Sequence, residues 1–284
     1  MCRLYGFHAN ENTKVECNLV HVQNALLKQG IQDRDGLTHG NGWGIAAYSD
    51  GEPSVERQCW AAWHGEHFSE AAARIYAKTV ISHIRRATVG GTALENTHPF
   101  RHGNWVFAHN GTIPHFNEVR PRLLEAIAGP HRDLIEGETD SEHVFRYFLT
   151  LHDRTPGRRP HDVLKACLAD IIALCADIDA SRMPALNTIL SDGVCVAGSR
   201  LGRTLWYLER KGPVTCEYCG LSHVQHNPRQ EYRAIEIASE PITHEDWRHV
   251  PNASVFHFSP SLEQIEFAAI DSSVLAKWSQ ANVA

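Results

Sequence analysis

The chain lacks long hydrophobic runs and long basic runs. No apolar stretch approaches the ~18 residues of a membrane span, and the N-terminus has no basic segment followed by an apolar run. Lys and Arg form no long run, and the formal net charge is −6, whereas a nucleic-acid or anionic-membrane surface needs a concentrated basic field. We therefore expect a cytoplasmic protein that acts on small molecules, with neither nucleic acid nor membrane among its partners.

A disulfide framework is also missing. The eight cysteines are dispersed over 284 residues without a signal peptide, so we expect them to be reduced. Cys216-Glu217-Tyr218-Cys219 has the spacing of a metal knuckle, and His223 and His226 follow closely enough to complete a four-ligand zinc set in principle. Because both histidines trail within one short loop, we expect two reduced loop cysteines. Neither a metal nor a cofactor is expected, since the 19 histidines show no catalytic metal spacing.

The order of periodic segments suggests sheets sandwiched between helix layers. Apolar runs bounded by turn residues predict strands at Leu4–Phe7, Gly42–Tyr48, Val80–Arg85, Trp105–His109, Thr188–Ser191, Val194–Ser199, Thr204–Glu209, Arg233–Ala238 and Ser254–Phe258. Helical spacing predicts helices at His21–Gln29, Phe68–Lys78, Glu118–Ala128, Asp140–Leu151 and His161–Cys175, with Thr155–Pro160 as an exposed connection. At 43% hydrophobic and 21% charged residues, we expect one compact unit with a real core.

Cys2 directly follows the initiator Met, so removing one residue would leave a thiol and a free α-amine on the same amino acid. An α-amine has an ordinary pKa near ~7.7–8.0, which suits a general base at neutral pH. An N-terminal amine that activates the nucleophile of its own residue is a known form of covalent catalysis. Taken alone, Cys2 is more typical of a small buried side chain.

Four further clusters carry side chains that such a nucleophile would need. In Ser82–Thr88 an Arg can clamp a carboxylate with its planar fork, although surface arginines are the simpler interpretation. Asn110-Gly111 is typical of a hairpin turn, yet its amide and N–H can also converge on an oxyanion. In Gly137–Glu142, Thr139 or Asp140 could cap a helix, and a carboxylate there could also pair with a substrate ammonium. Glu95–Phe100 places a His and a Pro in a loop.

Together these segments resemble class II glutamine amidotransferases. The matching segments occur in the order of that family: Met1–Arg3, His83–Thr88, Asn96–Pro99, His109–Thr112 and Thr139–Glu142. The later Ala238-Ser239-Glu240-Pro241 with Trp247 looks like the stand-alone branch of the family. The resemblance implies an α+β fold, the four-layer αββα sandwich of N-terminal-nucleophile hydrolases with mostly antiparallel sheets. We expect one domain over residues 1–284, with its motifs in residues 2–142.

The resemblance also implies a role for each matching residue. Cys2 is similar to the nucleophile, which would form a glutamyl thioester with glutamine or another γ-glutamyl amide. Asn110 with the Gly111 N–H corresponds to the oxyanion hole. Arg85 corresponds to the clamp for the α-carboxylate and Asp140 to the partner of the α-ammonium. Thr88 and His98 occupy supporting positions of the substrate-binding site.

Two departures from the multidomain members bear on function. Arg86 replaces the aromatic residue expected after the clamp, either as a ligand for an anionic extension of the substrate or as a surface charge. Residues 143–284 are expected to elaborate the same fold and not to form a synthase domain, so we expect no acceptor for ammonia within them. Three functions stay open: a glutamine amidotransferase subunit that passes ammonia to a partner, a stand-alone hydrolase of γ-glutamyl thiol compounds or peptides, and a non-catalytic binding protein. The intact site motifs argue against the third. The protein partner would be a separate synthase or hydrolase subunit. The alternative assembly is a homodimer.

Overall fold

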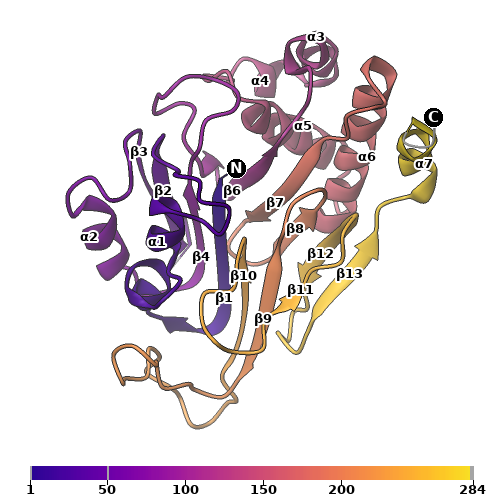
Figure 1. The fold of residues 1–284 in the computed structure, drawn as a ribbon. Helices are drawn as coiled ribbons and strands as arrows, with labels where there is room; N and C mark the ends of the chain where they lie inside the picture. The colour runs from indigo at the N-terminus through magenta and orange to yellow at the C-terminus, as the bar shows by residue number, and fades with distance from the viewer. Residues whose placement is uncertain (1, 50, 282–284) are drawn as a thin grey trace.

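Two antiparallel sheets face each other at the centre of this computed structural model, which describes residues 2–49 and 51–281 (Figure 1). In spatial order, the first sheet contains β11 (Arg248–His249), β9 (Trp206–Lys211), β10 (Arg233–Ala238), β1 (Arg3–Thr13), β4 (Ala77–Ile84), β2 (Trp43–Tyr48) and β3 (Ser54–Gln58). The second contains β13 (Ile265–Ala269), β12 (Ser254–Phe258), β8 (Val196–Arg200), β7 (Ala185–Ser191), β6 (Trp105–Thr112) and β5 (Phe100–His102). The strand that follows Cys2 is therefore central in its sheet, between β10 and β4.

The two sheets pack directly against each other through an apolar layer. Leu4, Ile81 and Ile189 are among the fully buried side chains of this layer. The sheets come closest at Gly6, where an added Cβ would lie 2.0 Å from Cδ1 of Ile189. A larger residue at position 6 would push the sheets apart, because protein interiors have little free space.

Helices cover the outer face of each sheet and complete four layers. The helices on the first sheet are the π-helix η1 (Cys17–His21), α1 (Leu26–Ile31) and α2 (His67–Ala73). The helices on the second sheet are α3 (Phe116–Ala126), α4 (Gly129–Arg132), α5 (Asp140–Arg154), α6 (Pro160–Ile178) and α7 (Ser272–Ala281). Separate buried clusters fill the two helix–sheet spaces. The predicted α+β fold with antiparallel sheets between helix layers is confirmed.

Two predicted helices are wrong in extent, and both errors have a tertiary cause. Val22, Ala25 and Leu26 of His21–Gln29 are buried and Leu27 is partly buried, but the chain forms η1, a break and then α1. The helix predicted over Phe68–Lys78 ends at Ala73, because Ala77 begins β4. That strand pairs with both β1 and β2, and pairing on two sides outweighs local helical propensity. The predicted exposed connection after α5 is confirmed as the short link to α6.

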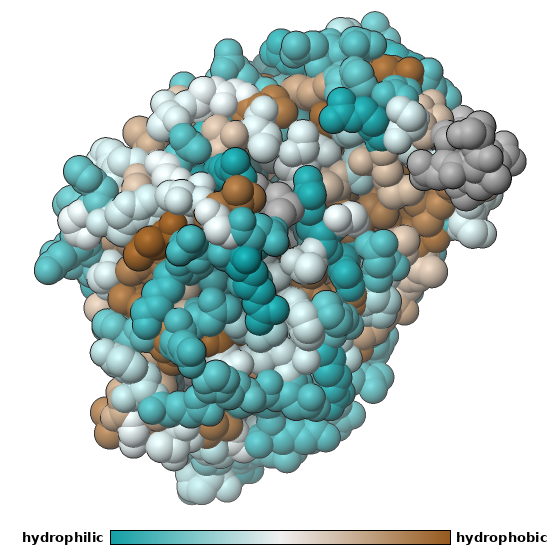
Figure 2. All heavy atoms as spheres, viewed as in Figure 1, coloured by the Kyte–Doolittle hydropathy of each residue, from teal (hydrophilic) through white to brown (hydrophobic). Residues whose placement is uncertain are grey.

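The outer surface is mixed in character. On the face in Figure 2, hydrophilic and neutral residues predominate, and hydrophobic residues form small separate groups. Within residues 2–49 and 51–281, no helix combines the length and the apolar character needed to cross a bilayer.

Candidate active site

Cys2 lies at the start of β1, where the two sheets meet. Its backbone N–H donates to Oδ1 of Asn110 in β6 over 3.1 Å. Its Sγ is 3.4 Å from both the N–H and the carbonyl oxygen of Arg86, so backbone groups hold the buried thiol on one side. Burial raises the pKa of the Cys2 thiol, whereas the hydrogen bond from Arg86 and the charge of Arg85 lower it and Asp140 raises it. The predicted nucleophile, clamp and ammonium partner therefore share one electrostatic environment.

Asn110 and Gly111 lie within β6 and do not form the hairpin turn that their sequence favours. They pair in register with Asn187 and Leu186 of β7. Gly111 is required here for space, because a Cβ at this position would lie 1.8 Å from the carbonyl oxygen of Ala185. A long-range strand partner thus overrides the local turn preference of Asn-Gly.

The direction of the Gly111 N–H follows from the hydrogen bonds of its neighbours. Leu186, opposite Gly111, donates its N–H to Leu201 on the other side of β7, so this pair is not hydrogen-bonded to each other. The Gly111 N–H consequently faces the opposite side, where β5 pairs only with Trp105–Phe107. Two residues on, the Ile113 N–H faces that same side and donates to Oδ2 of Asp140. The Gly111 N–H is therefore directed at an open part of the sheet, as an oxyanion donor must be.

Ser239 fixes the orientation of the Asn110 amide. Its Oγ accepts from Nδ2 of Asn110 at 3.2 Å and from the backbone N–H of Leu4 at 3.0 Å. With Oδ1 facing Cys2 and Nδ2 facing Ser239, the amide has one orientation rather than two. The sequence alone assigns no role to this serine; its signal is its place in Ala238-Ser239-Glu240-Pro241 directly after a predicted strand.

Arg85 is buried directly after β4, and the loop that follows wraps around its guanidinium. Nη1 donates to the carbonyl oxygen of Gly91 at 2.9 Å, and Nη2 donates to those of Val89 at 3.0 Å and Gly90 at 3.3 Å. Asn96 also binds the Gly91 carbonyl and accepts the N–H of Glu138, which ties this loop to the start of α5. Three of the predicted clusters thus form one structural unit around the guanidinium.

Within Thr139-Asp140-Ser141-Glu142, at the start of α5, Thr139 and Asp140 have different roles. Thr139 caps the helix by accepting the Glu142 N–H, so Asp140 is not needed as the cap. Asp140 accepts the Ile113 N–H at 2.8 Å and the Ser141 N–H at 2.8 Å. Its carboxylate is therefore held in place next to β6, and the positive end of the helix dipole favours its charge.

Thr88 and His98 lie in different surroundings. Thr88 is exposed, and its hydroxyl is 3.0 Å from that of Thr112, which follows the Asn110-Gly111 pair. His98 is buried between the rings of His83 and Phe100, with centroid distances of 4.2 and 4.6 Å. Neither ring nitrogen of His98 has a hydrogen-bond partner among the described residues. Burial lowers its pKa well below the usual value, so the ring is neutral. The structure thus places Thr88 beside the site strand and His98 inside the protein.

A buried ion-pair network anchors the residue after Cys2. The guanidinium of Arg3 contacts the carboxylate of Asp33 and that of Glu240, the second at 3.4 Å. Asp33 also pairs with His39 at 2.9 Å. The side chains of Arg3, Asp33 and Glu240 are at most 6% exposed. This network holds the start of β1 and the end of β10 together.

We expect Arg3→Met to lower the free energy of unfolding by about 3–5 kcal/mol, because it leaves the buried Asp33 carboxylate without its cation and leaves Glu240 with only the exposed Arg34. Urea unfolding followed by circular dichroism measures the change. Arg34→Met is the matched control: Arg34 pairs with the same Glu240, but its side chain is 62% exposed. We expect that control to cost only about 0–1 kcal/mol. An equal loss of unfolding free energy in the two variants would show that burial of the network does not contribute to stability.

The same network gives a prediction for acid stability. Burial alone raises the pKa of Asp33, but the Leu37 N–H, Arg3 and His39 outweigh it and lower this pKa to about 2. Since the folded pKa is below the unfolded value of ~3.9, the stabilisation is present above that pH and is lost as the pH falls toward about 2. We expect urea midpoints of the wild type to fall steeply in this window and those of Asp33→Asn to fall less. If the plots of urea midpoint against pH are parallel for the wild type and Asp33→Asn, the prediction is contradicted.

We expect Ser239→Ala to reduce turnover roughly tenfold, less than the 10²–10³ that follows loss of an oxyanion donor itself. The variant frees the Asn110 amide and leaves the buried Leu4 N–H unpaired, at a stability cost of about 1–3 kcal/mol. Ser239→Thr keeps the hydroxyl and serves as the control. Steady-state kinetics and thermal unfolding of both variants test the prediction, and full activity in Ser239→Ala would contradict it.

The four-layer αββα fold with Cys2 at the start of a central strand is that of the N-terminal-nucleophile hydrolases. Within that class, the family model described as "Glutamine amidotransferases class-II" matches residues 1–273, so the chain belongs to this family. Its function is that of the family, glutamine amidotransfer or hydrolysis of a γ-glutamyl amide.

Three individual proteins illustrate the relationship. The yeast Saccharomyces cerevisiae protein named "Probable glutamine amidotransferase DUG3" is 28% identical over 295 residues, covering 90% of this chain and 81% of the relative. The "Gamma-glutamyl-hercynylcysteine sulfoxide hydrolase" of Mycobacterium tuberculosis is 29% identical over 83 residues, or 29% of this chain and 36% of the relative. The crystal structure titled "predicted glutamine amidotransferase" from Pseudomonas aeruginosa aligns with a TM-score of 0.60 at 26% identity, covering 94% of this chain and 100% of that one.

Proposed function

We propose that Cys2 is the nucleophile of a glutaminase-type reaction that releases ammonia from glutamine or a related γ-glutamyl amide through a thioester. The observation that carries this proposal is the 3.1 Å contact between the Cys2 nitrogen and Oδ1 of Asn110. It places the nucleophile and its α-nitrogen beside an oriented amide and the outward-facing Gly111 N–H. These are the parts that acyl transfer requires.

The reaction requires removal of Met1, after which the α-amine of Cys2 takes the thiol proton. The thiolate forms a bond to the γ-carbonyl carbon, and the oxyanion accepts hydrogen bonds from Nδ2 of Asn110 and the N–H of Gly111. When the tetrahedral intermediate collapses, the C–N bond breaks and the α-ammonium returns its proton to the departing ammonia. Water then attacks the thioester, which releases glutamate and regenerates the thiol.

Arg85 and Asp140 are proposed to recognise the two charged ends of the glutamyl group. Arg85 keeps its positive charge despite burial, and the Asp140 carboxylate is held by two backbone N–H groups. An α-carboxylate and an α-ammonium placed between them would fix the γ-carbonyl relative to Sγ. Thr88, on the exposed side next to Thr112, is proposed to line the entrance, and His98 to support the site from behind.

A stand-alone hydrolase of larger γ-glutamyl compounds is a second candidate, and one pocket favours it. A pocket of about 260 Å³ is lined by Arg3, Arg34, Asp35, Gly202, Arg203, Thr204, Trp206 and Glu240. Arg3 and Glu240 adjoin Cys2 and Ser239 in the chain, so the pocket lies at the same end of β1 and β10 as the site. Arg203 and the Trp206 indole would suit a leaving group that carries carboxylates, whereas Arg3 and Arg34 already pair with Glu240.

Intact-mass spectrometry before and after exposure to a glutamine-mimicking diazoketone tests the proposal. We expect loss of Met1 and a single adduct that is absent from Cys2→Ala. A retained Met1 without an adduct would instead support a non-catalytic binding protein.

The two substrate classes are separated by comparing ammonia release from glutamine with hydrolysis of γ-glutamyl-cysteine peptides. A preference for glutamine supports a subunit that delivers ammonia to a separate synthase. A preference for the peptides, reduced in Arg203→Ala, supports the hydrolase. The eight free cysteines support a reducing compartment such as the cytoplasm, and a homodimer stays a prediction.

A further inference from the structure

The long loop between β9 and β10 buries little apolar surface. In Figure 1 this loop, coloured orange, extends away from the sheets at the bottom of the molecule. Between Lys211 and Tyr232, Val224 is the only buried residue, and Tyr218 and Leu221 are 60% and 67% exposed. Hydrophobic burial therefore contributes little to the conformation of this loop, and small segments without a core are commonly stabilised by metals or disulfides.

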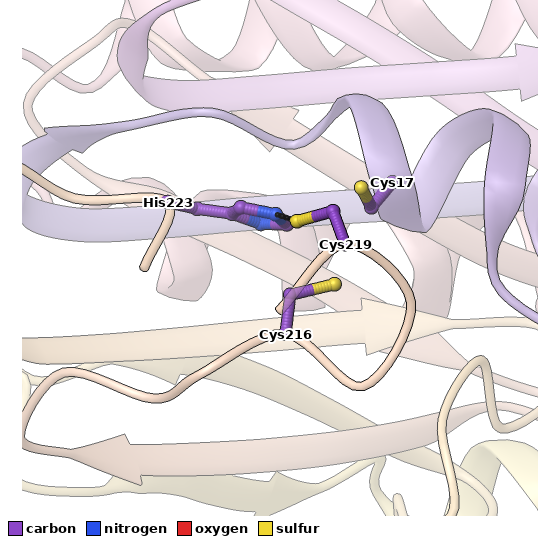
Figure 3. Close-up of side chains that lie close together, drawn as sticks. All are labelled: Cys17, Cys216, Cys219 and His223. Carbon is purple, nitrogen blue, oxygen red and sulfur yellow. Dashed lines mark hydrogen bonds between the residues drawn. The ribbon is translucent and has the colours of Figure 1, made fainter. Parts of the chain in front are cut away.

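Four potential metal ligands converge at the base of this loop. Cys216, Cys219 and His223 come from the loop, and Cys17 comes from the first residue of η1 (Figure 3). Their donor atoms all lie within 4.8 Å of one another, and Sγ of Cys219 is 3.3 Å from Nε2 of His223. In a tetrahedral zinc site, with Zn–S bonds of ~2.3 Å and Zn–N bonds of ~2.0–2.1 Å, donor atoms are separated by roughly 3.5–3.8 Å. Small side-chain movements would bring the four donors to those distances.

The loop backbone has the form that two cysteines at this spacing need in order to bind one ion. The Cys216 N–H donates to the carbonyl of Leu221, and the Gly220 N–H donates to the carbonyl of Cys216, both over 2.9 Å. Thr215 and Ser222 form an antiparallel bridge beneath this turn. Gly220, directly after Cys219, has φ of 72°, a left-handed conformation that glycine adopts at low cost. The turn therefore presents Cys216 and Cys219 on one side without strain.

We propose that Cys17, Cys216, Cys219 and His223 bind one Zn²⁺ ion in a closed, structural site. Three thiolates and one imidazole in a tetrahedral set are characteristic of zinc, and four protein ligands leave no position for a substrate. Binding releases three thiol protons to solvent, and the site then carries a net charge of −1.

This ligand set corrects the one that sequence spacing suggests. His226 is engaged elsewhere, because its Nδ1 is 2.9 Å from Oε1 of Glu11. Cys17 replaces it, about 200 residues before the other three ligands in the sequence. The bridge between Thr13 and Val224 and the hydrogen bond from the Lys14 N–H to the His223 carbonyl bring these distant segments together.

The zinc site is separate from the Cys2 site. Cys2 precedes the first residue of β1, whereas the loop contacts Thr13 at the other end of that strand. An extended strand of this length spans roughly 35 Å. We therefore expect metal loss to loosen the loop and η1 while leaving thioester chemistry at Cys2 intact.

Elemental analysis of the purified protein, expressed with zinc in the medium, tests the assignment. We expect about one zinc ion per chain, and loss of most of it in Cys216→Ser and in Cys17→Ser. Reconstitution with Co²⁺ should give the thiolate charge-transfer and visible bands of a tetrahedral site. A strong chelator should lower the wild-type melting temperature by more than roughly 5 °C and leave that of Cys216→Ser unchanged.

Two matched controls make the ligand assignment specific. Cys59→Ser removes a cysteine outside the cluster, and His226→Gln removes the neighbouring histidine; both should retain the metal. Should the serine variants fail to fold, alkylation of the wild type decides the question, because Cys17, Cys216 and Cys219 should react only after chelation. The diazoketone adduct at Cys2 should form with or without metal, so failure of the zinc proposal is distinguishable from failure of the proposed reaction.

Three results would overturn the assignment. One is an absence of bound zinc together with no tetrahedral cobalt spectrum. Another is iron with acid-labile sulfide in place of zinc. The third is retention of zinc in Cys17→Ser combined with its loss in His226→Gln.

Discussion

Cys2→Ala is expected to abolish both ammonia release from glutamine and formation of the diazoketone adduct. The substitution removes the atom that forms the thioester, and no other described thiol lies next to Asn110 and the Gly111 N–H. The fold should persist, because alanine fits a site where Sγ makes only the two contacts of 3.4 Å with the Arg86 backbone. Single-turnover assays and intact mass measure the loss.

Cys59→Ala is the matched control for this experiment. Cys59 is partly buried and follows β3, outside the site, so its removal should change neither rate nor adduct. Residual turnover of Cys2→Ala above the uncatalysed rate would show that another group attacks the substrate. In that case the assignment of the N-terminal cysteine as nucleophile would be wrong.

Asn110→Ala is expected to lower kcat by about 10²–10³ with a small change in KM, because it removes an oxyanion donor that acts mainly in the transition state. It also removes the acceptor for the Cys2 nitrogen and the donor to Ser239. Asn10→Ala is the control: Asn10 lies on the same strand as Cys2, but toward its far end.

A larger effect on KM than on kcat would contradict this role for Asn110. That result would mean that the amide binds the substrate in its ground state, since uniform binding changes KM alone. Burst kinetics separates the two cases, because thioester formation is the step that the oxyanion donors accelerate. Asn10→Ala should leave both constants unchanged.

Local patterns predicted the central strands and the layers of this fold, but not its long-range pairings. Val80–Arg85 and Trp105–His109 are recognisable because buried strands are rich in β-branched and aromatic residues. The Asn110-Gly111 pair has the sequence of a turn, and only its pairing with β7 makes it part of a strand. The expectation that residues 1–284 form one domain stays a prediction.

In the candidate site, too, some residues are predictable from local motifs, whereas others depend on contacts between segments far apart in the sequence. Cys2, Arg85, Asn110 and Asp140 were predicted because each lies in a motif with its own chemical rationale, and the structure places them in one region. Cys17 has no local motif, and Ala238-Ser239-Glu240-Pro241 by itself assigns no role to Ser239. Ser239 contacts Asn110 and Leu4, which lie 129 and 235 residues away, and Cys17 lies about 200 residues from the other three ligands. Sequence spacing carries no information about such contacts.

The position of β10 beside β1 has a consequence for synthesis on the ribosome. The chain emerges with Cys2 first, yet the strand that pairs with β1 and the hydroxyl that orients the Asn110 amide come from residues 233–239. A nascent chain that has not reached Ser239 therefore exposes a free thiol without an assembled oxyanion site. The proposed oxyanion site around Asn110 is therefore assembled only after residues 233–239 have paired with β1 and reached the amide.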